Sequence, residues 1–273
     1  MKIIEPAVEI ITEQNPLKRI ELCGRVCYKS EDKITDYSAY TFVKNIISRG
    51  HTSVLEHARV VIDSLDELGA FLANLDDSCL FCKDDTIFWQ AHARVHMYKE
   101  KYITMNVRDY LLFFPDADIE KIMDHKNADD YMTVRFICDR AIANELVRHR
   151  VFSFSQESTR YVNYKKGIEF IRPVPFEWAK DCEDKRFFAW EEVCRTAEVY
   201  YKELVENGCS PQEARNVLPL STKTELIMTG THKQWEDMLK LRLNRAAHPQ
   251  MQYLMKLLIC KQNFPQHKIN VTY

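Results

Sequence analysis

The sequence contains little glycine or proline and no excess of charge of either sign. Its 273 residues include 6 glycines and 9 prolines, which argues against a sandwich or propeller built from many tight turns. The formal net charge is -2, so we expect no general attraction to nucleic acid, and any anion site must be local. No apolar run reaches the roughly 20 residues that span a bilayer. No Gly-x-Gly-x-x-Gly or phosphate-loop motif is present, which argues against a Rossmann-type nucleotide site.

Apolar residues are abundant enough for a sizeable core. Hydrophobic residues make up 46% of the chain and aromatic residues 11%, which excludes disordered and fibrous architectures. A length of 273 residues suits one elaborate domain or two small ones, and we predict a single domain over residues 1–273. The 9 cysteines are scattered and odd in number, and Met1–Glu5 is too short and too acidic to begin an export segment. We therefore expect reduced thiols and a cytoplasmic protein.

Helical patterns dominate, with short strand patterns between them. Apolar spacing, helix-start residues and glycine stops predict helices over residues 15–26, 36–49, 139–148, 187–207 and 231–243, and a last helix that carries Tyr253–Leu258. Alternating or β-branched runs predict strands over residues 58–62, 132–136 and 224–228. We expect a polar, serine-rich loop over residues 153–164. The predicted fold class is α+β.

Two of the predicted helices carry specific signals. Thr231 with Gln234 three residues later is typical of a capping box. The other helix has an apolar stripe, formed by Phe187, Trp190, Cys194, Ala197, Tyr201 and Leu204. Residues three and four apart share one face of a helix, so we interpret Trp190 and Tyr201 as packing residues rather than as a stacking platform.

The segment between residues 65 and 130 is harder to assign. It contains short helical patterns near residues 65–75, one strand pattern around residues 87–95 and a polar connector over residues 116–127. We predict that residues 65–130, approximately, are an insertion on a smaller fold.

The densest group of polar residues starts at Arg148. Arg148, His149 and Arg150 are consecutive, which is more cationic character than the partial negative charge of a helix end requires. Polar residues continue after them, at Ser153, Ser155, Gln156, Ser158, Thr159 and Arg160. An arginine fork matches phosphate oxygens, and serine hydroxyls with loop amides complete such a cradle. The pattern indicates an anion site, with a solvated basic loop paired to surface acids as the alternative.

The same segment is similar to a known family. Arg148-His149-Arg150, seven residues and then Ser158 resemble the defining motif of the flavin-dependent thymidylate synthases, and the similarity runs through residues 148–161. Three more segments resemble that family in the same order: an upstream histidine segment at residues 51–57, an alanine-arginine turn before Leu-Pro-Leu at residues 214–220, and a closing segment at residues 241–250. The resemblance covers most of residues 15–64 and 131–262, and it does not extend to the stretch between them.

The resemblance implies a reaction and an architecture. The family methylates dUMP at C5 to give dTMP, with the carbon unit from methylenetetrahydrofolate and the hydride from reduced FAD, which NADPH regenerates. Its α/β fold packs a helical bundle on a mixed or antiparallel sheet and assembles as a homotetramer with shared active sites. By resemblance we expect FAD as the cofactor, dUMP, folate and NADPH as ligands, and self-association. We expect no metal, nucleic acid or membrane as a partner.

The resemblance also assigns roles to residues. Arg148 and Arg242 are the implied catalytic residues, and Arg242 would face the uracil carbonyl edge, where a fixed guanidinium stabilises developing negative charge. Flavin contacts are implied for His51, Ser53, Glu56, Arg148, His149, Arg150, Gln156, Thr231, Lys233 and Asp237. Contacts with dUMP are implied for Glu145, Gln156, Ser158, Thr159, Arg160, Arg215 and Arg242.

Several of these positions depart from the family pattern or allow two roles. Glu145 stands where many relatives carry glutamine, so it is expected either to contact the uracil or to pair with an arginine. Thr159 replaces a common glycine, and the segment after Arg242 is longer than usual, so Arg245 competes with Arg242 for one role. No neighbour of Ser158 identifies a base, so we interpret its hydroxyl as a phosphate ligand rather than a nucleophile.

Two weaker motifs are interpreted as ordinary side chains. Cys79 and Cys82 form a single Cys-x-x-Cys without a second pair at zinc-finger spacing. His92 and His96 are four residues apart but lack the glutamate of a His-Glu-x-x-His motif.

Two alternative functions are left open by the sequence. The chain could be a nucleic-acid-binding protein in which residues 148–166 follow phosphates and Tyr161 and Tyr164 stack on bases. It could also be a flavoprotein of the same fold that lacks synthase activity. Bound flavin and the formation of dTMP would distinguish these cases.

Overall fold

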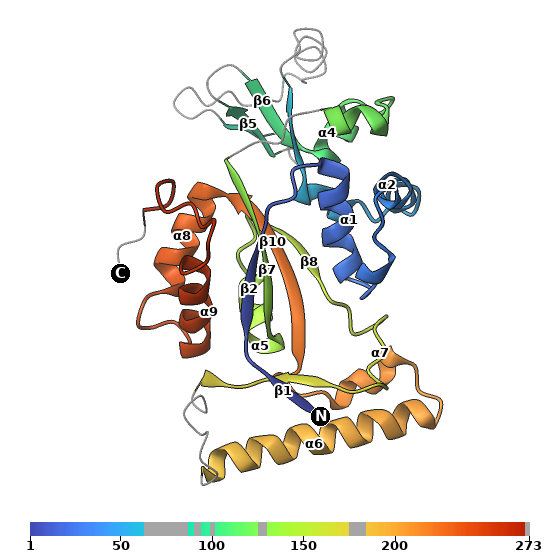
Figure 1. Ribbon diagram of the computed structural model, residues 1–273, viewed down its shortest axis with the longest axis vertical. Coiled ribbons are helices and arrows are strands. Elements are labelled where there is room, and N and C mark those ends of the chain that lie inside the picture. The colour runs from blue at the N-terminus through green and yellow to red at the C-terminus, as the bar shows by residue number, and fades with distance from the viewer. Residues whose placement is uncertain (63–86, 90–93, 99–101, 125–129, 175–183, 271–273) are drawn as a thin grey trace. The chain divides into compact units, whose positions relative to one another are not determined.

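The computed structural model describes residues 1–62, 87–89, 94–98, 102–124, 130–174 and 184–270. The chain forms two compact units (Figure 1). The first consists of residues 1–11, 26–29 and 132–273, and the second of residues 12–25 and 30–131. Each unit combines helices with a four-stranded sheet that contains antiparallel strand pairs, which confirms the α+β class.

The first unit is built on a four-stranded sheet. Its strands lie in the order β2 (Ala7–Ile11), β7 (Tyr131–Asp139), β10 (Lys223–Thr231) and β8 (Ser153–Gln156). β2 pairs with β7, and β8 with β10, in antiparallel register. Successive side chains of a strand point to opposite faces. Because apolar and polar residues alternate along these strands, the sheet has one apolar face and one polar face.

Three helices cover the apolar face of this sheet. They are α5 (Arg140–Leu146), α8 (His232–Arg242) and α9 (Pro249–Ile259), and Figure 1 shows α8 beside α9. Phe136 from β7, Met228 from β10 and Trp235 from α8 are buried in one core with Leu254 from α9. Burial of such side chains contributes about 1.5–3 kcal/mol each. This core therefore fixes the helices to the sheet that carries the candidate site.

The start of α8 has the predicted capping box. The Thr231 hydroxyl accepts a hydrogen bond from the Gln234 N–H at 3.1 Å, and the Gln234 side chain accepts one from the Thr231 N–H at 2.8 Å. Both bonds satisfy donors that would otherwise lack a partner at the helix start. The capping box is confirmed.

A second layer of the first unit contains a long helix. α6 (Lys185–Glu206) lies beside the two parallel strands β1 (Lys2–Ile4) and β9 (Glu169–Ile171) (Figure 1), and it is followed by α7 (Pro211–Ala214) and the 3-10 helix η5 (Arg215–Val217). Cys194 and Tyr201 of α6 are buried with Phe170 of β9, and Trp190 packs against the same cluster. The apolar stripe predicted for this helix is confirmed.

The second unit has its own sheet and its own core. Its strands lie in the order β3 (Arg59–Ile62), β6 (Tyr102–Asn106), β5 (Arg94–Tyr98) and β4 (Ile87–Trp89). The other elements are α1 (Pro16–Val26), α2 (Ser38–Ser48), α4 (Val107–Phe113) and the 3-10 helices η1 (Glu31–Lys33), η2 (Thr52–His57) and η3 (Ile119–Asp124). Leu17, Val43, Leu55, Val60 and Met105 are buried together in its core.

Three local predictions were wrong. The single strand expected over residues 87–95 is divided between β4 and β5, and the connector expected over residues 116–127 contains η3, which buries Ile122. The serine-rich loop expected over residues 153–164 begins with β8, where Ser153 and Ser155 lie opposite Thr229 and Ile227 of β10. The strand pattern of β8 could not be seen in the sequence because most of its side chains are polar. These are polar because this face of the sheet is itself lined with threonine and charged residues. The helical patterns near residues 65–75 lie outside the described residues.

Within the described part of the chain, no helix is both long and apolar enough to span a bilayer.

Candidate active site

A turn at the end of α5 presents the Arg-His-Arg segment. α5 ends at Leu146, and the His149 carbonyl accepts a hydrogen bond from the Phe152 N–H at 3.0 Å. Arg148 and Arg150 are exposed on this turn. The helix predicted over residues 139–148 thus ends two residues earlier, and Arg148 belongs to the turn rather than to the helix.

The beginning of α5 is held by a buried carboxylate. Asp139 accepts a hydrogen bond from the Ile142 N–H at 2.8 Å, and its other oxygen accepts one from the Gln250 side chain. Burial raises the pKa of Asp139. Gln250 also accepts a hydrogen bond from the Val174 N–H at 3.0 Å, so this residue of the closing segment ties α9 to α5.

Close packing fixes the other side of the turn. Phe152 is buried, with its ring centroid 4.8 Å from that of Trp235. A Cβ added to Gly230 would lie 2.5 Å from the Phe152 ring, a distance that van der Waals contact does not allow. Gly230 therefore lets the Arg-His-Arg turn pack directly against the residue before the α8 cap.

Arg148 and Arg160 form no ion pair with any described residue. In the part of the chain that the structure describes, the guanidinium of Arg148 makes no hydrogen bond or ion pair. Arg160 is exposed and lies over the Tyr161 ring at 5.4 Å. A guanidinium without a carboxylate partner is available for phosphate oxygens or other anionic groups.

Arg242 connects α8 with the end of α5. Its Nη1 lies 2.9 Å from a carboxylate oxygen of Glu145, and its Nε donates a hydrogen bond to Nε2 of His149 at 2.8 Å. Glu145 therefore pairs with an arginine, as one of the two predictions for it expected. The same contacts place Arg242 at the Arg-His-Arg turn, whereas Arg245 is exposed.

The contact with Arg242 requires a neutral His149. Burial, together with the positive charge of Arg242, lowers the pKa of His149 to about 4. The imidazole is therefore uncharged at neutral pH, and its Nε2 can accept the hydrogen bond from Arg242.

We predict that an NMR titration of His149 has its midpoint near pH 4 in the wild-type protein. The Arg242→Ala variant should titrate at a higher pH that is still below the ordinary value of about 6.5, because burial remains when the charge is removed. A wild-type midpoint near the ordinary value, or one that Arg242→Ala leaves unchanged, would contradict the geometry.

The segment after β8 brings together part of the predicted phosphate site. An Nη of Arg215 donates a hydrogen bond to the Thr159 hydroxyl at 3.3 Å, although the two residues are 56 positions apart in the sequence. The Ser158 hydroxyl accepts a hydrogen bond from the Arg160 N–H at 3.2 Å, and the Ser158 N–H donates one to the Cys27 carbonyl at 3.1 Å. Arg215 is thus brought to the residue that follows Ser158.

Gln156 stands at the end of β8, just before this segment. Its side-chain amide donates a hydrogen bond to the Thr224 hydroxyl at 3.4 Å. This contact joins Gln156 to the neighbouring strand β10.

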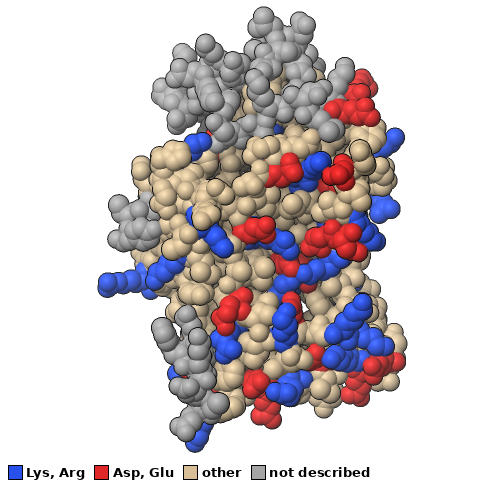
Figure 2. Space-filling model, viewed as in Figure 1, with Lys and Arg blue, Asp and Glu red and all other residues tan. Residues whose placement is uncertain are grey.

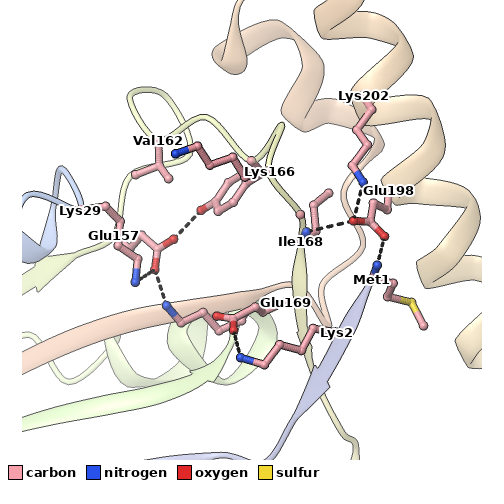
Figure 3. Close-up of a pocket in the computed structure, with 13 residues that line it drawn as sticks. Met1, Lys2, Lys29, Glu157, Val162, Lys166, Ile168, Glu169, Glu198 and Lys202 are labelled. Carbon is pink, nitrogen blue, oxygen red and sulfur yellow. Dashed lines mark hydrogen bonds and ion pairs between the residues drawn. The ribbon is translucent and has the colours of Figure 1, made fainter.

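A buried network of charged residues contacts this segment, and the sequence did not predict it. Glu157 is fully buried and contacts Nζ of Lys223 at 3.0 Å, and the Tyr164 hydroxyl donates a hydrogen bond to it at 2.7 Å (Figure 3). Lys223 also pairs with Glu225, which in turn pairs with Arg135. These contacts hold Glu157 in place, and Glu157 lies between Gln156 and Ser158 in the sequence. The network therefore holds the backbone from which the predicted phosphate ligands extend.

The flavin residues predicted on α8 are at the surface. Lys233 and Asp237 form an ion pair of 2.8 Å, with 69% and 58% of their side chains exposed. On the face drawn in Figure 2, basic and acidic side chains of the described residues are interspersed rather than gathered by sign.

The remaining predicted flavin residues belong to the second unit. His51 and Ser53 are exposed around η2, and Glu56 pairs with Arg108 at 2.6 Å. The structure therefore brings together Glu145, His149 and Arg242, and separately Thr159 and Arg215, while His51, Ser53 and Glu56 lie on another unit.

The metal motifs lie largely outside the described residues. Cys79, Cys82 and His92 are among the residues that are not described, and His96 is on β5. Among the described residues, no cluster of three or more histidine, cysteine or acidic side chains has the arrangement of a metal site.

Comparison with known proteins identifies the family. The sequence model of the family described as "Thymidylate synthase complementing protein" matches residues 9–64 and 127–266. The chain therefore belongs to this family, and the predicted resemblance is confirmed. The matched ranges contain every residue for which the resemblance implied a role.

Individual relatives carry a more specific name. The chain is 29% identical over 159 residues to the "Probable flavin-dependent thymidylate synthase" of Mycobacterium phage L5, which covers 55% of the chain and 64% of the relative. It is 30% identical over 142 residues (48% of the chain, 57% of the relative) to the "Flavin-dependent thymidylate synthase" of Pyrococcus furiosus. The protein of that name from Geobacter sulfurreducens is 34% identical over 118 residues, 41% of the chain and 50% of the relative. The matches thus span between half and just under two thirds of these relatives.

Proposed function

We propose that the protein is an FAD-dependent thymidylate synthase that converts dUMP to dTMP. The carbon unit would come from methylenetetrahydrofolate, and NADPH would supply the reducing equivalents. The observation that carries the proposal is the exposed, uncompensated guanidinium of Arg148 at the family's Arg-His-Arg motif. The proposal includes the family fold over residues 1–273, with residues 65–130 as an insertion.

The residues of the Arg-His-Arg turn are chemically suited to hold FAD. Arg148 and Arg150 are exposed, and guanidinium groups bind diphosphates and the electron-rich edge of a reduced flavin. The neutral His149 lies between them and is oriented by Arg242. FAD, when bound, supplies the hydride of the reaction. The proposed contribution of the protein is to hold the flavin ring beside the nucleotide.

The segment after β8 is the proposed site for the phosphate of dUMP. Ser158 and Thr159 offer hydroxyl groups, and Arg160 and Arg215 offer guanidinium groups. The hydrogen bond from Arg215 to Thr159 supports this assignment because it brings a distant arginine to the hydroxyl segment. A dianionic phosphate fits two guanidinium groups better than one.

Arg242 is proposed to stabilise negative charge on the uracil while C5 attacks the carbon donor. Its guanidinium already holds Glu145 at 2.9 Å. The uracil carbonyl would have to share Arg242 with this carboxylate or displace it. Glu145 is therefore proposed to set the position and the availability of Arg242 rather than to bind uracil alone.

We also propose that the protein assembles into a homotetramer with shared active sites. His51, Ser53 and Glu56 would then contact flavin held by another copy of the chain. The exposure of His51 and Ser53 supports this because a residue that completes a neighbour's site must reach the surface. Light scattering would measure the mass in solution, and a monomer that is fully active would contradict the proposal.

The function is tested by release of tritium from C5-labelled dUMP, together with the formation of dTMP. Purified protein should release tritium only when dUMP, methylenetetrahydrofolate, FAD and NADPH are all present. Omission of each component in turn provides the controls. Flavin that is bound and reduced without any dTMP would identify a flavoprotein that lacks synthase activity, and a colourless protein that binds oligonucleotides would contradict the proposal.

We predict that Arg215→Ala raises KM for dUMP by about tenfold or more, because it removes a charge-assisted contact with the phosphate. kcat should change less, since the phosphate is bound equally in the ground state and the transition state. Steady-state kinetics measure both constants. Arg195→Ala is the matched control, because Arg195 is exposed on α6 and pairs with Glu191. Equal KM values for the two variants would contradict the assignment of Arg215.

A further inference from the structure

A second candidate binding site is a pocket of about 620 Å³ in the first unit. It lies among β1, β9, α6 and the segment that follows β8 (Figure 3). Its lining includes five lysines and three glutamates, namely Lys2, Lys29, Lys166, Lys202, Lys223, Glu157, Glu169 and Glu198. None of these residues is among those that the resemblance assigns to flavin or dUMP.

The first carboxylate of the lining is already neutralised. Glu157 lies 3.0 Å from Nζ of Lys223 and 3.6 Å from Nζ of Lys29, and it accepts a hydrogen bond from the Tyr164 hydroxyl. Lys29 and Lys223 also pair with Glu225, which Arg135 contacts as well, so three cations serve two carboxylates here. This side of the pocket leaves no negative charge for a cationic ligand.

The other two carboxylates are neutralised as well. Glu198 lies 2.9 Å from Nζ of Lys202 and accepts a hydrogen bond from the Ile168 N–H at 3.2 Å, and Glu169 lies 2.7 Å from Nζ of Lys2. Figure 3 shows Glu157 with Lys29 on one side of the pocket and the Glu198 group on the other. The pocket is thus bounded by two ion-pair clusters.

One lysine of the lining has no acidic partner among the described residues. Among the described residues, the ammonium group of Lys166 has no hydrogen bond or ion pair. Lys2, Lys29 and Lys202 retain 69%, 34% and 37% of their side-chain exposure beside their partners. An entering anion would therefore meet an unpaired ammonium and lysines that can shift toward it. Val162 and Ile168 provide an apolar wall.

We propose that this pocket binds a phosphomonoester, a small organic molecule that carries one dianionic phosphate. The excess of lysine over glutamate selects an anion, and a dianion gains more than a carboxylate from several ammonium groups. The volume is in the range of about 300–1,000 Å³ typical of small-molecule sites, and the apolar wall provides a surface for the organic part. Glu157 forms part of the wall and directly precedes Ser158, so the pocket adjoins the proposed dUMP-phosphate segment without sharing its ligands.

Isothermal titration of the full chain tests the proposal, with ribose 5-phosphate, AMP and inorganic phosphate as probes. The Arg160→Ala/Arg215→Ala double variant serves as the starting protein, so that phosphate contacts of the proposed dUMP site do not contribute. This protein should bind ribose 5-phosphate or AMP. Adding Lys166→Glu should weaken that binding by about tenfold or more, and adding Lys166→Gln by about fivefold.

Lys165→Glu is the matched control, because Lys165 is the exposed neighbour of Lys166 and does not line the pocket. It gives the same net charge as Lys166→Glu and should weaken binding less than twofold. Tighter binding of AMP would identify a nucleotide, and tighter binding of ribose 5-phosphate a sugar phosphate; both support the proposal. Three results would overturn the proposal. The first is that neither ester binds to a protein that thermal melting shows to be folded. The others are that Lys166→Glu and Lys165→Glu weaken binding equally, or that inorganic phosphate binds as tightly as both esters.

Discussion

Replacing Lys223 by methionine is expected to lower the free energy of unfolding by about 3–5 kcal/mol. Only 6% of the Lys223 side chain is exposed, and it pairs with two carboxylates that are also buried, Glu157 and Glu225. Methionine fills a similar volume but leaves both carboxylates without their shared cation. Lys29 and Arg135 still contact this network, so the loss should lie toward the lower end of the range. Urea denaturation measures the change.

Lys240→Met is the matched control for this prediction. Lys240 forms an ion pair with Glu236 on α8, and half of its side chain is exposed (50%). An exposed pair of this kind contributes about 0.2–1 kcal/mol. If Lys223→Met were no less stable than Lys240→Met, the buried network would not be what holds the segment after β8.

The same network predicts how stability depends on pH. Burial alone would raise the pKa of Glu225, but hydrogen bonds from Lys223 and Lys29 outweigh it and lower this pKa to about 2. A lowered carboxylate pKa stabilises the folded state above the unfolded value of about 4.3. That contribution is lost as the pH falls from about 4.3 toward 2. Lys223→Met should therefore show a smaller loss of stability over this interval than the wild-type protein.

The second large effect is expected for Arg242→Ala, which should reduce kcat/KM for dTMP formation by about 100-fold to 1,000-fold. The proposed role of this guanidinium is to stabilise charge that develops on the uracil in the transition state. Its removal should therefore lower kcat as well as kcat/KM. Tritium release under saturating dUMP measures the effect on kcat.

Arg245→Ala separates the two assignments that the sequence left open. Arg245 is exposed, whereas Arg242 is held by Glu145 and His149. Arg245→Ala should reduce kcat/KM by less than about threefold, because a surface substitution away from a site has little effect. The reverse order, with Arg245→Ala the more damaging variant, would contradict the proposed role of Arg242.

The sequence predicted those structural features whose residues lie close together along the chain. The Thr231 capping box and the apolar stripe of α6 were both predicted because their partners are three or four positions apart. That Glu145 pairs with an arginine was predicted only as one of two alternatives, and Arg242 was not predicted to be that arginine. These residues are 97 positions apart, and a helix pattern does not say which distant side chain it meets.

The charge network of Glu157 could not be predicted from its separate residues. Lys223 is 66 positions from Glu157, and each looks like an ordinary surface charge. A usable signal was present in β10, where Lys223 and Glu225 are two residues apart and share one face of a strand. Charges at that spacing inside an otherwise buried strand indicate a paired, buried network. The resemblance also gave no indication of the pocket that Glu157 lines.

The central claim is that the Arg-His-Arg turn and the segment after β8 hold a pyrimidine nucleotide against a flavin. Equilibrium dialysis of the folded protein with FAD and dUMP tests it most directly. We predict saturable binding of both molecules, with FAD weakened by Arg148→Ala and dUMP weakened by Arg215→Ala. A well-folded protein that retains neither molecule at saturating concentration would contradict the claim.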